Sequence, residues 1–181
     1  MKNKFSSVID NIMIDKLADL KNGKEVPLSF VVFLKEGYCV FEPAEMGLDK
    51  EVAIFFMRDM LKTIATEAYC ILSDTNIRSP ETMEIVGEQF MAMTVGKNGD
   101  ISAFTRQYVR QNGKIEFVES LMKNNDMNYG GRMCELYQPN EKNLDEKLSP
   151  IMVAAHKAFV KENLKPYPGR EHNRDDGMSI H

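Results

Sequence analysis

Two Asn-Gly pairs constrain how the middle of this chain can fold. One lies in "GKNGD" (residues 96–100) and the other in "QNGK" (residues 111–114). Asn-Gly favours tight β-hairpin turns because both residues tolerate the positive φ angles that a type I′ loop needs. The segments on either side, "EQFMAMTV", "ISAFTRQYVR" and "KIEFVESL", are rich in β-branched and aromatic residues. The sequence therefore predicts a three-strand antiparallel meander over residues 88–121.

The second turn decides which side chains of the last two strands face each other. A two-residue type I′ loop makes Gln111 the partner of Lys114 and leads to these pairs: Arg110–Ile115, Tyr108–Phe117, Arg106–Glu119 and Phe104–Leu121. The stripe formed by Phe104, Arg106, Tyr108 and Arg110 then joins the apolar face of the next strand. A three-residue loop with a bulge at Gly113 shifts the pairing by one residue and leaves that stripe free. Asn-Gly favours the first register.

Three helices and further strands flank the meander. Residues 6–23 read as a helix with Ser7 as N-cap and a stop at Gly23, and residues 149–164 as another with Ser149 as cap and Pro150 at its first position. Residues 48–65 read as a helix capped by Asp49, with this apolar arc: Val52, Phe55, Phe56, Met60 and Ile64.

The remaining strands come from apolar runs. "LSFVVFL" and "YCVFEP" predict a hairpin, and the first of its strands is apolar on both faces, as a central strand would be. "EAYCILSD" (residues 67–74) predicts another strand, and we interpret residues 76–87 as a connection broken by Pro80. The predicted class is α+β, a mostly antiparallel sheet (hairpin plus three-strand meander) with about three helices packed chiefly on one face.

The length of 181 residues suits a single domain, which we place at residues 1–164. Within it, residues 123–148 form a long polar loop, with a short strand at "MCELY" (133–137). Residues 165–181 contain two prolines and two glycines, with few apolar side chains, and are predicted to form an extended C-terminal tail.

Charge and cysteine usage limit the classes of function. The formal net charge is −4 and the pI about 5.5, so a nucleic-acid site would have to be a local patch. We see no signal peptide and no apolar run near the roughly 20 residues of a membrane span. Cys39, Cys70 and Cys134 are odd in number and lie in apolar or mixed runs, which predicts reduced thiols and a cytoplasmic setting in a host cell, or a virion.

Residues with the potential for chemistry are few. There is no phosphate-binding loop motif, and we predict neither a cofactor nor a metal site. His156 lies on the apolar side of the last helix, where hydrogen bonding to a neighbour is the favoured interpretation over metal binding. Asp74 and Glu42 end two predicted strands and could converge to hold Mg²⁺ in a metal-dependent enzyme, although turn hydrogen bonds by Asp74 and Asn76 are favoured.

Two segments carry a resemblance. "EAYCILSDTNIRSPE" followed by "EQFMAMTVGKNGDISAFTRQYVR" resembles uncharacterised small proteins of phages and mobile elements, over residues of about 66–110. In those proteins a similar strand precedes a charged, Pro-containing connection and a hairpin, with a tryptophan where this chain has Asn76. The resemblance implies a phage or mobile-element origin and supplies no catalytic residue.

The leading hypothesis is a non-enzymatic protein-interaction protein, phage-encoded, acting as a virion component or a host-interaction factor through the 123–148 loop and the tail. The candidate contact residues are Tyr129, Arg132, Tyr167, Arg170 and Arg174. The partner is a virion protein, a host protein or another copy, and neither nucleic acid nor membrane is the expected partner. The alternative is a nucleic-acid-binding protein that uses the strand face of Phe104, Arg106, Tyr108 and Arg110. The third hypothesis is the enzyme at Asp74 and Glu42.

Overall fold

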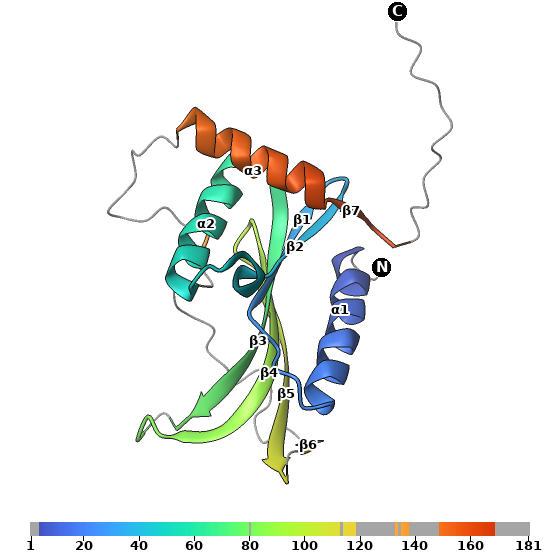
Figure 1. The fold of residues 1–181 in the computed structure, drawn as a ribbon, viewed down its shortest axis with the longest axis vertical. Helices are drawn as coiled ribbons and strands as arrows, with labels where there is room; N and C mark the ends of the chain where they lie inside the picture. The colour runs from blue at the N-terminus through green and yellow to red at the C-terminus, as the bar shows by residue number, and fades with distance from the viewer. Residues whose placement is uncertain are drawn as a thin grey trace, which may run out of the picture.

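A computed structural model describes residues 4–79, 81–112, 114–118, 133, 135–137 and 149–168. Its elements follow in chain order (Figure 1): α1 (Lys4–Lys21), β1 (Ser29–Leu34), β2 (Gly37–Phe41), the short 3₁₀ helix η1 (Pro43–Met46), α2 (Lys50–Thr63), β3 (Thr66–Arg78), β4 (Ile85–Gly96), β5 (Ile101–Gln111), β6 (Lys114–Phe117), α3 (Pro150–Asn163) and β7 (Lys165–Pro166).

The strands form one curled sheet in the order β6-β5-β4-β3-β1-β2-β7, and each neighbouring pair is antiparallel. The α+β class with a mostly antiparallel sheet is therefore confirmed. The predicted hairpin is β1–β2, and the predicted meander is β4–β5–β6. β1 pairs with both β2 and β3, which explains why its residues are apolar on both faces.

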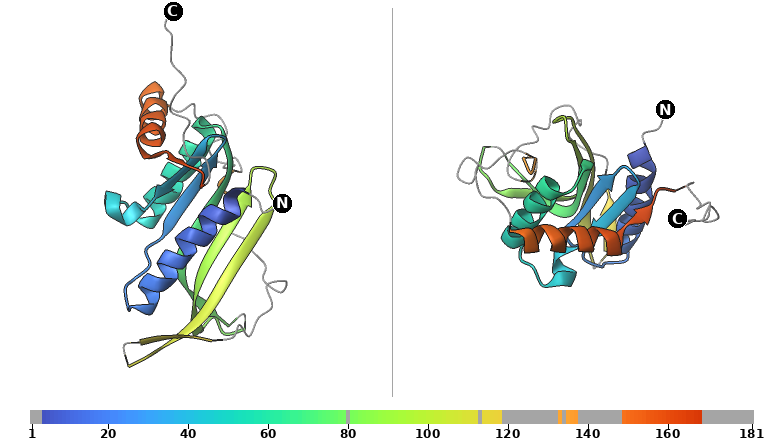
Figure 2. Two further views of the ribbon diagram at one scale, coloured as in Figure 1. Left: turned by 90° about the vertical axis from the view of Figure 1, so that its right-hand side faces the viewer. Right: turned by 90° about the horizontal axis from the view of Figure 1, so that it is seen from above.

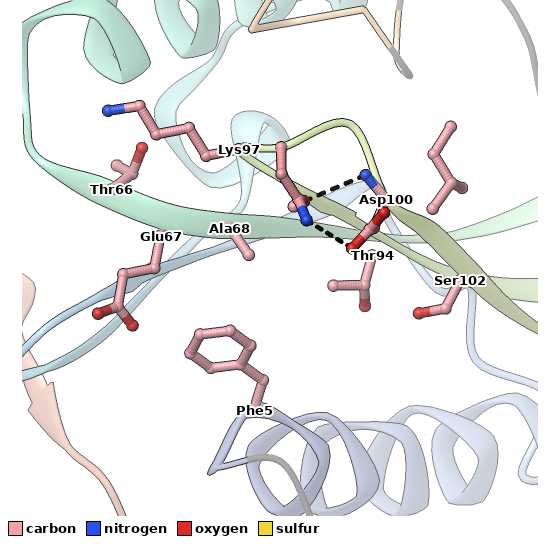
Figure 3. Close-up of a pocket in the computed structure, with 11 residues that line it drawn as sticks. Phe5, Thr66, Glu67, Ala68, Thr94, Lys97, Asp100 and Ser102 are labelled. Atoms are coloured by element: carbon pink, nitrogen blue, oxygen red, sulfur yellow. Dashed lines mark hydrogen bonds between the residues drawn. The ribbon is translucent and has the colours of Figure 1, made fainter.

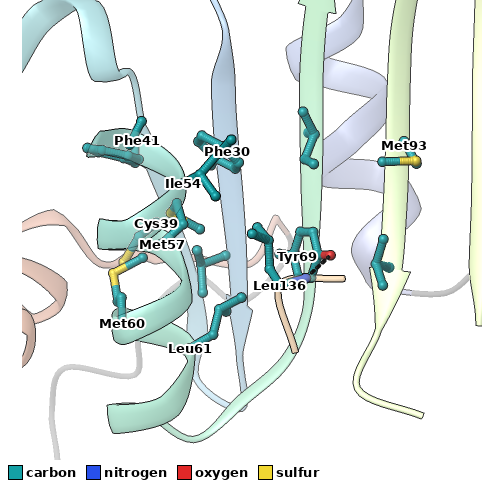
Figure 4. Close-up of a cluster of buried hydrophobic side chains, with 14 of the residues drawn as sticks. Phe30, Cys39, Phe41, Ile54, Met57, Met60, Leu61, Tyr69, Met93 and Leu136 are labelled. Atoms are coloured by element: carbon teal, nitrogen blue, oxygen red, sulfur yellow. Dashed lines mark hydrogen bonds between the residues drawn. The ribbon is translucent and has the colours of Figure 1, made fainter. Parts of the chain in front are cut away.

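Each face of the sheet has its own hydrophobic core (Figure 2). α2 and α3 cover one face, where Phe30, Phe41 and Tyr69 pack with residues of both helices (Figure 4). α1 crosses the opposite face, where Val31 and Phe33 pack with the apolar side of that helix. Alternate residues of β1 therefore enter different cores, as the two-residue period of a strand requires.

Local signals in the sequence account for most helix ends. Gly23 has a φ of 78°, and the Gly23 and Lys24 N–H groups donate to the carbonyls of Leu20 and Asp19, which makes a Schellman stop. Asp49 and Ser149 cap α2 and α3 by accepting from backbone N–H groups three residues on. The predicted cap at Ser7 is wrong, since α1 already begins at Lys4.

The apolar arc predicted for α2 is partly wrong. Val52 and Phe55 are 46% and 52% exposed, whereas Ala53 and Ile54 are buried. The prediction followed the largest apolar side chains around the helix. The sheet instead packs against a neighbouring stripe of α2 that includes small Ala53, because close packing depends on shape as well as on hydrophobicity.

The interpretation of residues 76–87 as a connection is also largely wrong. β3 continues to Arg78 and β4 begins at Ile85, with Ile77 opposite Gly87 and a register shift between Ile77 and Arg78. We call residues 75–79 and 81–89, the outer ends of β3 and β4, the arm. The arm extends past the helices at the lower end of the sheet (Figure 1).

The start of the predicted tail is folded. Lys165 and Pro166 pair with Tyr38 and Gly37 as β7, and Tyr167 is buried. The extended tail predicted from residue 165 is therefore wrong for residues 165–167, whereas residues 169–181 lie outside the described residues. The strand predicted at 133–137 is wrong too, since Met133 and Glu135–Tyr137 lie in turns.

Candidate functional site

Tyr108 of the β5 stripe belongs to the core, whereas Phe104, Arg106 and Arg110 are exposed. Tyr108 lies opposite Phe117, as the type I′ register predicts, and Asn112 has the positive φ of 51° that this turn requires. The two rings are 6.4 Å apart, and Tyr108 is only 2% exposed. Arg106 lies over the Phe117 ring at 5.6 Å. The predicted partners of Arg106 and Phe104 on the next strand, Glu119 and Leu121, lie outside the described residues.

A polar network ties three adjacent strands together around Tyr108. The Tyr108 hydroxyl donates to Asp74 of β3, and Arg110 donates to both carboxylate oxygens of Glu88 on β4 at 3.1 Å. Arg110 also reaches Asp74 Oδ2 at 3.2 Å and stacks over the Tyr108 ring. Burial, then the hydrogen bond to Asp74, raises the pKa of Tyr108 above its usual value. Two carboxylates thus offset the charge of Arg110, whereas Arg106 remains exposed on this face.

Asp74 and Glu42 both lie on the α1 side of the sheet, yet each is bound to a different cation. Lys16 Nζ lies 2.5 Å from Glu42 Oε1, which also accepts from Ser29, whereas Asp74 is bound by Tyr108 and Arg110. In the described part of the chain no three His, Cys, Asp or Glu side chains are grouped to hold a metal ion. The turn expected at Asp74 is wrong, because β3 continues through it.

His156 is a buried structural residue, as predicted. Its Nδ1 lies 3.2 Å from the Thr63 hydroxyl on α2, and its ring packs edge-on against Phe56. Burial lowers the pKa of His156, and the nearby Asp59 carboxylate opposes this effect. The histidine is therefore held neutral between α2 and α3, where it joins the two helices.

Two of the three cysteines are described, and both are buried free thiols. Burial raises the pKa of Cys39 to about 11 and that of Cys70 to about 12. Such thiols stay protonated at neutral pH and are poor nucleophiles.

A hollow of about 550 Å³ lies between the first turn of α1 and the β4–β5 turn (Figure 3). Phe5 forms one wall, and Thr94 and Ser102 lie on the sheet beneath it. Two of the polar side chains at its rim, Asn98 and Asp100, are already in use, because they hydrogen-bond each other to form the turn. This arrangement identifies no ligand.

Arg58 Nε on α2 and Gln89 Oε1 on β4 are buried and have no hydrogen-bond partner among the described residues. Neither side chain lines a hollow described here. Their burial alone therefore defines no site.

The most unusual surface is the end of the arm. Met83, Ile85 and Val86 are 63%, 54% and 64% exposed, although each is large and apolar. Beside them lies a hollow of about 270 Å³ whose apolar lining comes from Ile77, Val86, Val109 and Val118. Monomeric proteins rarely group exposed apolar side chains in this way unless the surface contacts something.

Hydrogen bonds close the turn at the tip of the arm. Met83 N–H donates to the Ser79 carbonyl, and Ser79 N–H donates to that of Glu84, both at 2.9 Å. Arg78 donates to the Met83 carbonyl at 2.8 Å, and the Ser79 hydroxyl accepts from the N–H groups of Glu81 and Thr82. The apolar side chains are therefore held outward by a hydrogen-bonded turn.

Sequence reasoning missed this surface, because "ETMEIVG" mixes charged and apolar residues and read as a connection. Of the residues predicted to contact a partner, Tyr129, Arg132, Arg170 and Arg174 lie outside the described residues. Tyr167 is inside the fold: it is 4% exposed, and its hydroxyl donates to the Leu34 carbonyl at 2.6 Å. Tyr167, which was predicted to contact a partner, is therefore a core residue of the fold.

The fold and this surface define an α+β protein whose curled antiparallel sheet carries helices on both faces and ends in an arm with exposed apolar residues. Comparisons of the chain with protein-family models, with curated proteins and with solved structures gave no match. No helix in the described ranges combines the length and the apolar character needed to cross a membrane.

Proposed function

We propose that this chain is a non-enzymatic protein-interaction protein that contacts its partner through the tip of the arm. The observation that carries the proposal is the exposure of Met83, Ile85 and Val86 on a hydrogen-bonded turn. Burying one side chain of this size stabilises a contact by about 1.5–3 kcal/mol. Three of them beside an apolar hollow supply the core of a modest protein–protein interface.

Other parts of the proposal rest on the sequence. In this proposal, the polar segment 123–148 and residues 169–181 also contact the partner. The partner is a virion protein, a host protein or a second copy of the chain. Phage encoding rests on the resemblance over residues of about 66–110. A cytoplasmic setting is supported by the two buried free thiols, Cys39 and Cys70.

The test compares two variants that carry the same change on different surfaces. Val86→Asp places a carboxylate in the arm surface, and Ile151→Asp does so on α3, where Ile151 is 81% exposed. Tagged full-length chains are used to capture proteins from the cells in which the protein is naturally made, followed by quantitative mass spectrometry. We expect Val86→Asp to reduce capture of a specific protein at least about tenfold, a change of about 1.4 kcal/mol.

Ile151→Asp should capture that protein at the native level. Circular dichroism melting of both variants checks that the fold is intact, since both positions are exposed. Equal capture by the native chain and Val86→Asp contradicts the proposal.

A further inference from the structure

One of the residues that line the hollow on the arm has no side chain. Gly87 lies opposite Ile77 in the β3–β4 ladder, and the two line the hollow together with Val109 of β5. A Cβ atom at Gly87 would lie 3.5 Å from Ile77 Cδ1, an ordinary contact, so a larger side chain there would extend into the hollow without disturbing the backbone. The volume of about 270 Å³ admits one large aliphatic side chain.

The same arm also presents a protruding side chain. Met83 is 63% exposed and has a φ of 61°, a left-handed conformation that costs a residue with a Cβ about 1–2 kcal/mol. A glycine would adopt this conformation at little cost. The chain therefore holds an apolar side chain outward at an energetic cost, in a conformation that hydrogen bonds from Arg78 and to Ser79 maintain.

Charged side chains lie around both features. Glu81 and Glu84 flank the protruding Met83, and both are exposed. Arg78 and Glu88 line the hollow. Glu88 is already in an ion pair, which leaves the exposed Arg78 as the lining charge that a partner can contact. An incoming copy of the tip would bring its two carboxylates toward an arginine.

In a two-fold contact each pair of residues occurs twice, so each copy must present both halves of the contact. The arm does so: it carries a protruding side chain, Met83 (the knob), and a hollow beside Gly87 (the hole), with complementary charges around them. A different partner would need only one of the two halves. We infer that the arm is a self-association surface: Met83 of one copy enters the hollow of another, and Glu81 and Glu84 of the first approach Arg78 of the second. The inference rests on the proposed function and names its partner as a second copy of this chain.

Sedimentation velocity on the full chain, from low micromolar to near-millimolar concentration, tests the inference. We expect a reversible monomer–dimer equilibrium in the micromolar range, because the contact is small. Met83→Gly removes the knob and relieves the unfavourable φ. It should weaken association at least about tenfold, the loss of a single buried side chain, with an equal or higher melting temperature. Gly87→Leu fills the hole and should weaken association to a similar extent.

Charge variants test the pairing. Glu81→Gln together with Glu84→Gln leaves the Arg78–Met83 hydrogen bond in place. This double variant should weaken association and make it less dependent on salt. Ile151→Asp is the matched control on another exposed apolar residue and should associate like the native chain.

A native chain that is monomeric throughout the range overturns the inference, and so does a dimer that either Met83→Gly or Gly87→Leu leaves unchanged. These failures are distinct from failure of the proposed function. If the native chain is monomeric but still captures another protein, and Val86→Asp reduces that capture, then the self-association inference is wrong and the proposed interaction function still holds.

Discussion

At the scale of single residues, the stripe on β5 shows that one pattern of side chains can either stabilise a fold or bind a ligand. Which of the two occurs depends on the residues that the side chains contact. Tyr108 and Arg110 sit in a pattern typical of nucleic-acid binding, yet in the fold they contact Asp74 and Glu88 on two neighbouring strands. The sequence predicted the register, because the Asn-Gly turn acts locally. It did not predict these partners, since they come from strands whose order no local signal encodes.

The network predicts a pH dependence for Tyr108. The native pKa is raised above the ordinary value of 10.0, so the native state binds the phenol proton more tightly than the unfolded state does. This contribution to stability is complete below pH 10 and is lost as pH rises toward the native pKa. We therefore expect the free energy of unfolding of the native chain to fall above pH 10 more steeply than that of Tyr108→Phe.

Urea titrations at a series of pH values measure this difference. Below pH 9, Tyr108→Phe should be less stable by about 1–2 kcal/mol, because it leaves Asp74 with one hydrogen-bond donor fewer. Parallel pH profiles for the two proteins would show that the phenol proton does not contribute.

At the scale of elements, β7 acts as a latch that joins the end of α3 to the β1–β2 hairpin. Tyr167 packs near Phe5 and Tyr38, and its hydroxyl is bound to the Leu34 carbonyl. The latch approaches Gly37 so closely that a Cβ there would lie 2.2 Å from the Lys165 carbonyl oxygen. No side chain can be accommodated at that distance without displacing one of the two backbones.

Gly37→Ala should therefore release β7 and expose Tyr167, with increased amide exchange at Tyr38 and a lower melting temperature. Hydrogen exchange followed by mass spectrometry measures the release. Gly87→Ala is the matched control, because its Cβ would lie at an ordinary 3.5 Å from its nearest neighbour. Native protection at Tyr38 in Gly37→Ala would show that β7 does not need the close approach.

Truncation separates the latch from the residues that follow it. A chain ending at Pro168 keeps β7 and Tyr167 and should melt close to the native temperature. A chain ending at Leu164 loses the buried Tyr167 ring and should be less stable by about 3–5 kcal/mol, the usual cost of losing a large core aromatic. Thermal melts of the two truncated chains measure this difference, with Tyr167→Ala in the full chain for comparison. Equal melting temperatures of the two truncated chains would show that β7 and Tyr167 do not stabilise the fold.

The elements also show what sequence can and cannot predict. The caps at Asp49 and Ser149, the stop at Gly23 and the Asn-Gly turns were predicted because each depends on a few neighbouring residues. The buried stripe of α2, the length of β3 and β4, and the docking of Tyr167 depend on packing between distant segments. The arm surface was missed for the same reason, since its exposure is a property of the whole fold.

At the scale of the whole molecule, two cores share the strands of one sheet, and β1 contributes to both. Phe30 and Phe33 of β1 are both fully buried, yet Phe30 belongs to the α2–α3 side and Phe33 to the α1 side, where it stacks on Phe5 at 4.6 Å. Loss of β1 would open both cores at once. The two sides should therefore unfold together in one cooperative transition.

Phe30→Ala and Phe33→Ala test this coupling, one from each face. Each should lower the free energy of unfolding by about 3–5 kcal/mol, the usual cost of a buried phenylalanine. Because β1 is common to both cores, amide exchange under mild denaturant should rise in α1 and in α2 alike, whichever phenylalanine is replaced. If Phe33→Ala instead raised exchange in α1 alone while α2 kept native protection, the two faces would be separate folding units and the shared strand would not couple them.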